Sequence, residues 1–397
     1  MSTAKEAPVK RTAALVGLAA LVTSLGLLLV ACGSQRPLAT AQPSIHPPSG
    51  SWRTLPSAPV RVDAGLTGVW TGKEMIVTGT RPGPDGTYTD SKDLAAAYDP
   101  ATRAWRRLPN PPKTESYCRR SAVWTGRQVL VWGCALLGFD PLTDRWQRLP
   151  QPLGAMGTAV WTGRELIGWG GGCCGDASSD GSAYSPATAS WRKLAPSPLA
   201  PEQRPLGIWT GRELLLFVSG INPASGKPWP ARFARAAGYD PATDSWRRLA
   251  PIPDRGLRFG GSAAWDGHEM LLVGAGGRAR SALAYDPGTN RWRRLARLPV
   301  GRSDARTVWT GRRLLVWGSL ETASSASPVA LAYDPGTDRW SRLARSPLHG
   351  LAQAVVWTGH ELLVWGGVVP TPAGTNAPVR YLDTGAAFTP TPERSAP

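Results

Sequence analysis

The chain repeats one short phrase, and this repetition limits what it can fold into more than any other feature. In the copy at residues 239–249, an aromatic residue precedes Asp-Pro, and a tryptophan follows seven residues after the aromatic one. Copies of this phrase begin at Tyr98, Phe139, Tyr184, Tyr239, Tyr285 and Tyr333. A second phrase, Trp-Thr-Gly and then an apolar run, begins at Trp70, Trp124, Trp161, Trp209, Trp309 and Trp357, with Trp265-Asp266-Gly267 as a variant. A spacing of roughly 40 to 50 residues is typical of an array of small structural units.

Each phrase predicts a β-hairpin. The glycine of the Trp-Thr-Gly phrase supplies the positive φ that a two-residue hairpin turn needs, which places Thr-Gly at the turn. The flanking runs, such as 122–124 and 129–132, are apolar at successive positions, so both faces of the sheet are covered. In the other phrase, Asp and Thr can bond turn backbone and Pro fixes φ at the corner. Each unit therefore has four short strands, and the chain is predicted to be an all-β, seven-bladed β-propeller of four-stranded antiparallel blades.

The two ends of the array indicate how the ring closes. Seven Trp-Thr-Gly-type phrases stand against six complete aromatic-to-tryptophan phrases, and the segment 386–391 is a degenerate copy with no tryptophan after it. At the other end, Ser51-Trp52-Arg53-Thr54 reads as a fourth strand with no third strand before it. We therefore predict that the N-terminal strand completes the C-terminal blade, which removes free sheet edges.

These residues resemble the kelch repeat, the blade unit of galactose-oxidase-like propellers. The resemblance rests on the tyrosine of the third strand, the tryptophan of the fourth and a diglycine after the second, intact at Gly170-Gly171 and Gly366-Gly367. It covers about residues 51–391. It implies a ring of blades around a channel, with the connections that enter each first strand forming the rim of its mouth.

The N-terminus predicts export and lipidation. Residues 1–31 contain Lys5, Lys10 and Arg11 before an apolar run, which is the layout of a secretory signal peptide. Leu29-Val30-Ala31-Cys32 resembles the lipobox of bacterial lipoproteins, which implies cleavage before Cys32 and diacylglycerol on its sulfur. An uncleaved transmembrane anchor is the alternative. Residues 32–50 are Pro-rich and predict a tether, so we expect a lipid-anchored protein on the extracytoplasmic face of the cell membrane.

The charge of the chain is strongly basic. Lys and Arg number 45 against 28 Asp and Glu, giving a formal net charge of +17. Many arginines follow the fourth-strand tryptophans, where they protect the outer edge or form a basic belt for anionic lipids or wall polymers. No nucleic-acid-binding motif is present, and export argues against such a partner. We expect a monomer whose partners are the membrane and an anionic glycan or envelope protein.

Four cysteines besides Cys32 are expected on one face of two adjacent blades: Cys118, Cys134, Cys173 and Cys174. An even number outside the cytoplasm favours disulfides. We prefer Cys118–Cys134 with a vicinal Cys173–Cys174 bridge, while the crossed pairings stay open. Zinc is a weaker alternative because no histidine lies near them in the sequence. No metal and no cofactor are therefore predicted.

The sequence favours a non-catalytic protein. His268 and His360 occupy a turn position that holds Arg or Lys in other blades, and only His349 lies in a connection that enters a first strand. One candidate base without a nucleophile does not make a triad, and no set of His and Tyr ligands suits copper.

The channel mouth is the predicted ligand site. Basic residues in the connections that enter first strands are expected to form a collar there: Arg119, Arg120, Arg204, Arg258, Arg302, Arg306 and His349. Guanidinium groups bind carboxylate or phosphate bidentately, so a non-catalytic binding or scaffold protein for an anionic glycan or envelope component is the first hypothesis. The alternative is a carbohydrate-active enzyme, a sialate- or galactose-oxidase-like propeller, at the same mouth. Residues 392–397 are expected to form a C-terminal tail.

Overall fold

The computed structural model of the protein describes its β-sheets and most of their connections. Described are residues 50–83, 90–114, 120–133, 135–172, 175–253, 261–274, 280–300, 302–320, 328–350, 353–369 and 380–391. The chain divides into two compact units, Met1–Ser44 and Ile45–Pro397, and every described strand belongs to the second. Within the described ranges, no helix has the length and hydropathy that a membrane span requires. The predicted leader (1–31), the predicted tether (32–50) except for Gly50, and the predicted C-terminal tail (392–397) lie outside them.

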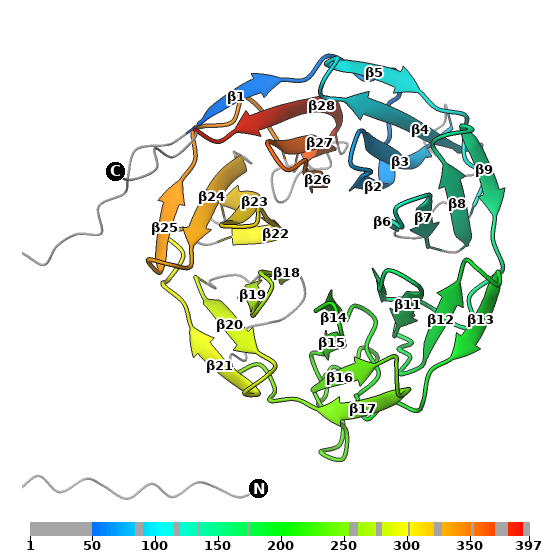
Figure 1. The fold of residues 1–397 in the computed structure, drawn as a ribbon, viewed down its shortest axis with the longest axis vertical. Coiled ribbons are helices and arrows are strands. Elements are labelled where there is room, and N and C mark those ends of the chain that lie inside the picture. Colours follow the sequence, from blue (N-terminus) through cyan, green and yellow to red (C-terminus); the bar gives the residue numbers. More distant parts are fainter. Residues whose placement is uncertain are drawn as a thin grey trace, which may run out of the picture. The chain divides into compact units, whose positions relative to one another are not determined.

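The second unit is a seven-bladed β-propeller, as predicted. Seven four-stranded antiparallel sheets stand around a common central axis (Figure 1). In six blades the strands follow chain order from the inside outward, and each blade begins with its innermost strand. We number the blades 1 to 7 by the order of these innermost strands.

The strands fall into four sets by their position in the blade. The innermost strands are β2 (Ala64–Trp70), β6 (Ser121–Trp124), β10 (Thr158–Trp161), β14 (Leu206–Trp209), β18 (Ser262–Trp265), β22 (Arg302–Trp309) and β26 (Ala354–Trp357). The second strands are β3 (Met75–Arg81), β7 (Val129–Trp132), β11 (Leu166–Trp169), β15 (Leu214–Phe217), β19 (Met270–Val273), β23 (Leu314–Leu320) and β27 (Leu362–Val369). The third strands are β4 (Lys92–Asp99), β8 (Leu136–Asp140), β12 (Gly181–Ser185), β16 (Ala236–Asp240), β20 (Ala282–Asp286), β24 (Pro328–Asp334) and β28 (Arg380–Thr389). The outermost strands are β5 (Ala104–Arg107), β9 (Arg145–Arg148), β13 (Ser190–Lys193), β17 (Ser245–Arg248), β21 (Arg291–Arg294), β25 (Arg339–Arg342) and β1 (Ser51–Thr54).

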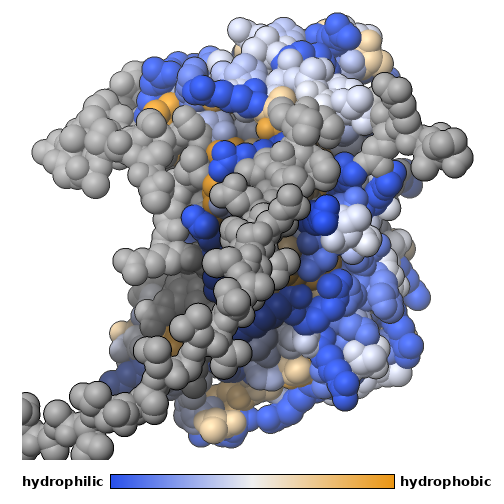
Figure 2. All heavy atoms as spheres, turned by 90° about the vertical axis from the view of Figure 1, so that its left-hand side faces the viewer, coloured by the Kyte–Doolittle hydropathy of each residue, from blue (hydrophilic) through white to orange (hydrophobic). Residues whose placement is uncertain are grey.

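Burial follows this order. The second strands are buried on both faces, as in Val129–Trp132, because each is covered by the neighbouring blades. The outermost strands alternate between exposed and half-buried residues. On the side of the ring that carries β25, the described surface is mostly hydrophilic with small apolar areas (Figure 2). The core therefore lies between blades and not within any one of them.

The turn between the first and second strands lies one residue later than predicted. In blade 1 the backbone N–H of Thr71 donates to the carbonyl of Glu74, so Gly72 and Lys73 form the turn. Gly72 has φ +91°, and the Thr71 hydroxyl accepts the N–H of Glu74 at 3.0 Å. The threonine thus stabilises the turn with its side chain, and glycine is required at its first position.

The turn between the third and fourth strands holds one residue in the left-handed region. This residue is Arg103, Asp144, Ala189, Asp244, Asn290 or Asp338 in blades 1 to 6, with φ between 49° and 56°. Four of the six are Asp or Asn, which tolerate this conformation better than other non-glycine residues. We refer to this place as the left-handed turn position.

Closure of the ring follows the prediction. Blade 7 has the strand order β1-β28-β27-β26, with Trp52 opposite Phe388 in an antiparallel pair. The Trp52 ring lies 5.2 Å from Phe388 and 5.4 Å from Trp317 of blade 6. Blade 7 is therefore built from both ends of the described chain, and it has no turn that connects its third and fourth strands.

Candidate functional site

Of the predicted collar, Arg120, Arg204 and His349 lie in connections between the fourth strand of one blade and the first of the next, whereas Arg302 and Arg306 belong to the innermost strand β22. Arg204, between β13 and β14, has an exposed side chain on a loop that Glu202 fixes. The Glu202 carboxylate is 3% exposed and accepts the N–H of Ser219 from the neighbouring connection of blade 4 at 2.8 Å. Buried hydrogen bonds of this kind hold the backbone at the rim, so the guanidinium projects from a fixed support.

Arg306 and His349 lie in different parts of the ring. Arg306 is half-buried on β22, beside a register shift in its pairing with β23. Its Nη1 donates to the carbonyl of Ala305 at 3.3 Å, and among the described residues it forms no ion pair. His349 is exposed in the connection between blades 6 and 7. Of the two, His349 therefore lies in a connection at the predicted rim, whereas Arg306 lies in an innermost strand.

Arg120 has a different environment from the one expected of a collar residue. Its guanidinium is 4% exposed and donates to the Asp93 carboxylate, which is 2% exposed, at 2.7 Å. Asp93 also accepts the hydroxyl of Thr80 at 2.6 Å and the backbone N–H of Thr114 at 3.0 Å. The structure thus places Arg120 in a buried structural ion pair. Its guanidinium already binds Asp93 and is not exposed to a ligand.

The remaining predicted site residues cannot be compared with the structure. Outside the described residues lie Cys32, Cys118, Arg119, Cys134, Cys173, Cys174 and Arg258. For Arg302 the backbone belongs to β22, while its side chain lies outside the description. The disulfide pairings, the lipidation and three members of the collar stay predictions.

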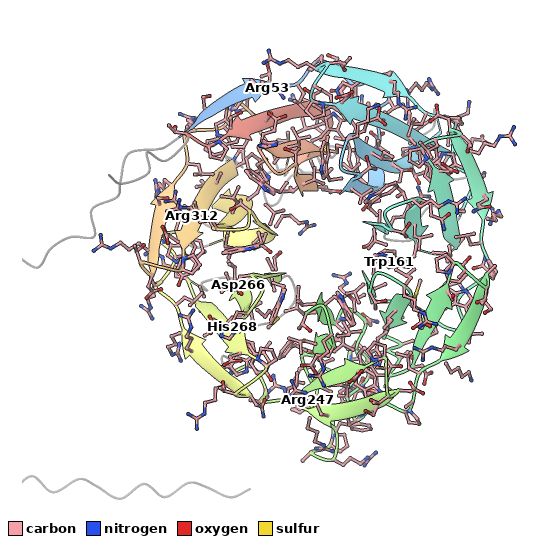
Figure 3. All side chains as sticks on the ribbon, in the orientation of Figure 1. Arg53, Trp161, Arg247, Asp266, His268 and Arg312 are labelled. Carbon is pink, nitrogen blue, oxygen red and sulfur yellow. The ribbon has the colours of Figure 1, made fainter. Side chains whose placement is uncertain are left out.

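The arginines of the fourth strands have partners that the sequence analysis did not foresee. In five blades the arginine after the tryptophan forms an ion pair with the glutamate immediately before the second strand of the same blade: Arg53–Glu361, Arg106–Glu74, Arg192–Glu165, Arg247–Glu213 and Arg293–Glu269. The hydrogen bonds that Arg106 donates to Glu74 hold the pKa of Arg106 above its usual value. Figure 3 shows Arg53 and Arg247 at the outer edge of the ring. These cations are therefore internally neutralised, which favours a structural role over a free basic belt.

A cleft lies where the ring closes, on the face opposite the collar. We call it the seam cleft: a hollow of about 740 Å³ between blade 7 and blade 1. It is lined by Ser51, Arg53, Trp70, Gly72, Lys73, Asp99, Pro100, Ala101, Arg103, Thr358, His360, Glu361 and Thr389. These residues come from the turns of blade 1, the first turn of blade 7 and the two unconnected strand ends of blade 7. The sequence analysis missed it, although the absent turn of blade 7 was visible in the repeat.

The acids of the seam cleft already have partners. Both carboxylate oxygens of Glu361 accept hydrogen bonds from Arg53, at 2.8 and 3.0 Å, and Asp99 accepts the backbone N–H of Ala101 at 2.8 Å. Lys73, Arg103 and His360 are exposed. Within the described ranges none of these three forms an ion pair. Among the described residues, the cleft therefore presents three exposed basic groups that form no ion pair.

The side chains do not suit a catalytic metal. Among the described residues, no group of three or more His, Cys, Asp or Glu side chains could hold one ion. His268 and His360 lie in the turns after β18 and β26, and His349 in a connection on the other face. The buried carboxylates of Asp93 and Glu202 are fully engaged with their own neighbours. Among the described residues, these side chains therefore do not converge on a copper site.

Comparisons with known proteins agree with the fold. No protein-family model matches the chain, and no curated protein matches its sequence. Among solved structures, a fungal alcohol oxidase of the AA5 family in complex with copper is similar, with a TM-score of 0.60 and 15% sequence identity. The match covers 86% of this chain and 76% of the oxidase. The chain is thus a seven-bladed β-propeller with the architecture of a galactose-oxidase-like enzyme, and the likeness extends to the fold alone.

Proposed function

We propose that the protein is a membrane-tethered, non-catalytic binding propeller whose ligand is an anionic glycan or another anionic component of the cell envelope. The ligand site is the collar, with Arg204, Arg306 and His349 as its described members. Two acids near this face, Asp93 and Glu202, are buried and engaged with their own neighbours, which favours a non-catalytic role, whereas Asp176 and Asp180 are exposed.

One observation supports an anionic ligand. Five arginines of the outer strands each bind a glutamate of their own blade, whereas Arg204 and Arg306 form no ion pair with any described residue. An arginine at a protein surface gains most from a bidentate partner, and carboxylates and phosphates match its planar fork. Rim arginines left without an internal carboxylate are therefore suited to bind one from a ligand.

The tether supports the cellular setting. The lipobox-like Leu29-Val30-Ala31-Cys32 precedes a Pro-rich segment that leads to β1. Lipidation of Cys32 predicts that the protein sediments with membranes, and that the variant Cys32→Ser does not acquire the mass of a diacylglycerol. A wild-type protein without that added mass would contradict the anchor.

The ligand is tested by titration. We expect galacturonate or N-acetylneuraminate to bind the full chain in nonionic detergent, and neutral galactose not to bind. Changing Arg204 and Arg306 to Gln removes bidentate bonds, so the affinity should fall at least about tenfold. The control is Arg107→Gln, because Arg107 is exposed on β5, an outermost strand, and is not one of the predicted collar residues. Absence of uronate and sialate binding at millimolar ligand would remove the proposal.

The alternative, a carbohydrate-active enzyme, has one point in its favour: the likeness to the AA5 alcohol oxidase. That likeness is one of architecture, and among the described residues no group of three or more His, Cys, Asp or Glu side chains could hold a metal ion. Turnover of galactose or a sialoside by the purified protein would favour it over the binding role.

A further inference from the structure

We infer that the seam cleft is a second anion site, distinct from the collar, and that it binds a phosphate group. The cleft has the size of a small-molecule site, since such sites enclose about 300 to 1,000 Å³. Its origin is specific to one place in the ring. Only blade 7 takes its third and fourth strands from opposite ends of the described chain, and the missing turn leaves the hollow beside Ser51 and Thr389.

Comparison with the equivalent turn positions of the other blades shows how the charge of the seam cleft differs from theirs. At the left-handed turn position, blades 2, 4 and 6 carry Asp144, Asp244 and Asp338, whereas blade 1 carries Arg103. At the corner where five blades carry the aspartate of the aromatic-Asp-Pro phrase, blade 7 carries Thr389. Two acidic positions of the repeat are thus replaced, by a cation and by a neutral residue, and both replacements line the same cleft.

At the other seams, acids at the left-handed turn position have clear roles. Asp144 accepts two hydrogen bonds from Arg106 of the preceding blade, both at 2.8 Å. At the closing seam the corresponding arginine is Arg53, and it binds Glu361 and the hydroxyl of Tyr98 instead. Arg103 therefore takes no part in an ion pair within the described residues, and its guanidinium is free to bind a ligand.

The chemistry of the three exposed basic groups fits phosphate. Arg103 supplies a planar fork that matches two phosphate oxygens, and Lys73 supplies a point charge. His360 adds a further donor from blade 7. Trp70 contributes an apolar wall, which suits the organic part of a phosphate ester. A ligand held from both blades would also join the two ends of the ring.

Two sources of phosphate are possible at this position. The chain enters the propeller at Ser51, on the rim of the cleft, so a tether from Cys32 would hold the cleft within roughly 65 Å of a bilayer. The source is then a glycerophospholipid headgroup; otherwise it is a soluble phosphate ester. The headgroup source rests on the proposed tether, whereas the phosphate site does not.

The test uses a variant that the repeat itself suggests. Residues 45–397 contain the whole closed ring, so this segment carries its complete core and is used for both arms. The double variant Lys73→Gln, Arg103→Asp places aspartate where three other blades already hold it in the same conformation, so the fold is retained. The matched control is Arg127→Gln, at the turn position equivalent to Lys73 but in blade 2.

The first arm titrates glycerol phosphate calorimetrically, and the second measures co-sedimentation with phosphatidylcholine vesicles with and without phosphatidylglycerol. We expect binding in at least one arm, a loss of at least about tenfold in the double variant and less than about twofold in the control. Binding of glycerol phosphate identifies a soluble ester, and binding of anionic vesicles alone identifies the headgroup. No binding in either arm, or equal binding by parent and double variant, overturns the site. Uronate binding at the collar is measured on the same proteins, and its loss or retention reports on the proposed function separately.

Discussion

The indole N–H of Trp52 donates a hydrogen bond to the carbonyl oxygen of Ala344 at 2.8 Å, across 292 positions of the sequence. The same bond joins every pair of adjacent blades: Trp105 to Pro56, Trp146 to Pro109, Trp191 to Pro150, Trp246 to Ala195, Trp292 to Ala250 and Trp340 to Ala296. The seam between blades 6 and 7 therefore uses the contact that joins the other six pairs of blades, although Trp52 and Ala344 lie near opposite ends of the described chain.

Replacing Trp52 should weaken closure. Trp52→Ala removes an aromatic side chain that packs on Trp317 and Phe388 and leaves the Ala344 carbonyl without its donor. We expect the free energy of unfolding to fall by about 3 kcal/mol. Urea unfolding of the variant and its parent measures this. Leu142→Ala is the control, because Leu142 is 89% exposed and should change little. Equal stability of the Trp52 variant and the parent would contradict the closure.

Removing β1 should create a free edge. A chain that begins at residue 56 lacks Ser51–Thr54, and β28 then exposes the backbone groups that pair with them. Unpaired strand edges bind other strands, so we expect concentration-dependent oligomers in light-scattering chromatography. An added peptide of residues 50–56 should restore the monomer by occupying the edge, whereas a peptide of the same composition in scrambled order should not. A monodisperse truncated monomer would show that the strand is dispensable.

The residue whose carbonyl accepts the tryptophan N–H varies together with the residue at the left-handed turn position of the next blade. Where the first is alanine, the next blade carries an acceptor for its N–H: Ala195 with Asp244, Ala250 with Asn290, Ala296 with Asp338. Where it is Pro56, Pro109 or Pro150, there is no N–H, and the turn holds Arg103, Asp144 or Ala189.

This pattern predicts coupling between Ala296 and Asp338. Asp338→Ala alone should cost about 1 to 3 kcal/mol, because it leaves the Ala296 N–H and the Tyr333 hydroxyl without an acceptor. In an Ala296→Pro background the same change should cost less, since one donor is already absent. A double-mutant cycle in urea measures the coupling. Additive effects would mean that the two positions vary independently.

The buried pair of Arg120 and Asp93 should matter for stability and not for ligand binding. Asp93→Ala leaves a guanidinium that is 4% exposed without its carboxylate, which should cost about 3 to 5 kcal/mol. Arg120→Met with Asp93→Leu removes both charges and should cost less than either single change. Uronate affinity of the folded double variant should equal that of the parent, because neither group reaches the solvent.

The hydrogen bond between Tyr239 and Asp244 should appear in the pH dependence of stability. Tyr239 donates to Asp244 and holds the pKa of that carboxyl below its usual value, so this stability is present above the unfolded pKa and lost in acid. Burial, assisted by Asp244, raises the pKa of Tyr239 to about 12, so the matching stability is present below about pH 10 and lost as the pH rises through 12. Tyr239→Phe should flatten both ends of the profile measured by urea unfolding, since Phe139 fills this place in blade 2.

Most of the fold could be predicted from the sequence because each hairpin depends on neighbouring residues and the pattern recurs in every blade. The tryptophan that follows each aromatic-Asp-Pro corner lies opposite that aromatic residue in the antiparallel pair of strands, as Trp246 does with Tyr239. The diglycines predicted from the repeat take positive φ, 70° and 107° at Gly170 and Gly171. The turn between the first and second strands was predicted one residue too early. In blade 1 the hydroxyl of Thr71, and not its carbonyl, accepts the backbone N–H of Glu74.

The candidate site was predicted less well, because the sequence shows which residues are basic and not what they contact. Arg120 and Arg204 follow the same pattern in the repeat, yet only Arg120 meets a buried carboxylate, supplied by Asp93 of the preceding blade. The outer arginines were expected to face solvent, and five of them bind glutamates that lie 24 to 308 positions away in the sequence. Such partners come together only when strands pair.

The sequence by itself determined the number of blades, their four strands and the strand exchange that closes the ring, because hairpins depend on neighbouring residues and a repeat states them again in every unit. Only the tertiary structure decided which charges are neutralised and where a hollow remains, because Coulomb interactions depend on distances between blades that no local pattern specifies. The seam cleft shows the difference. Its residues occupy positions that other blades of the repeat also have, and only the meeting of blade 7 with blade 1 places Arg103 and His360 around one space.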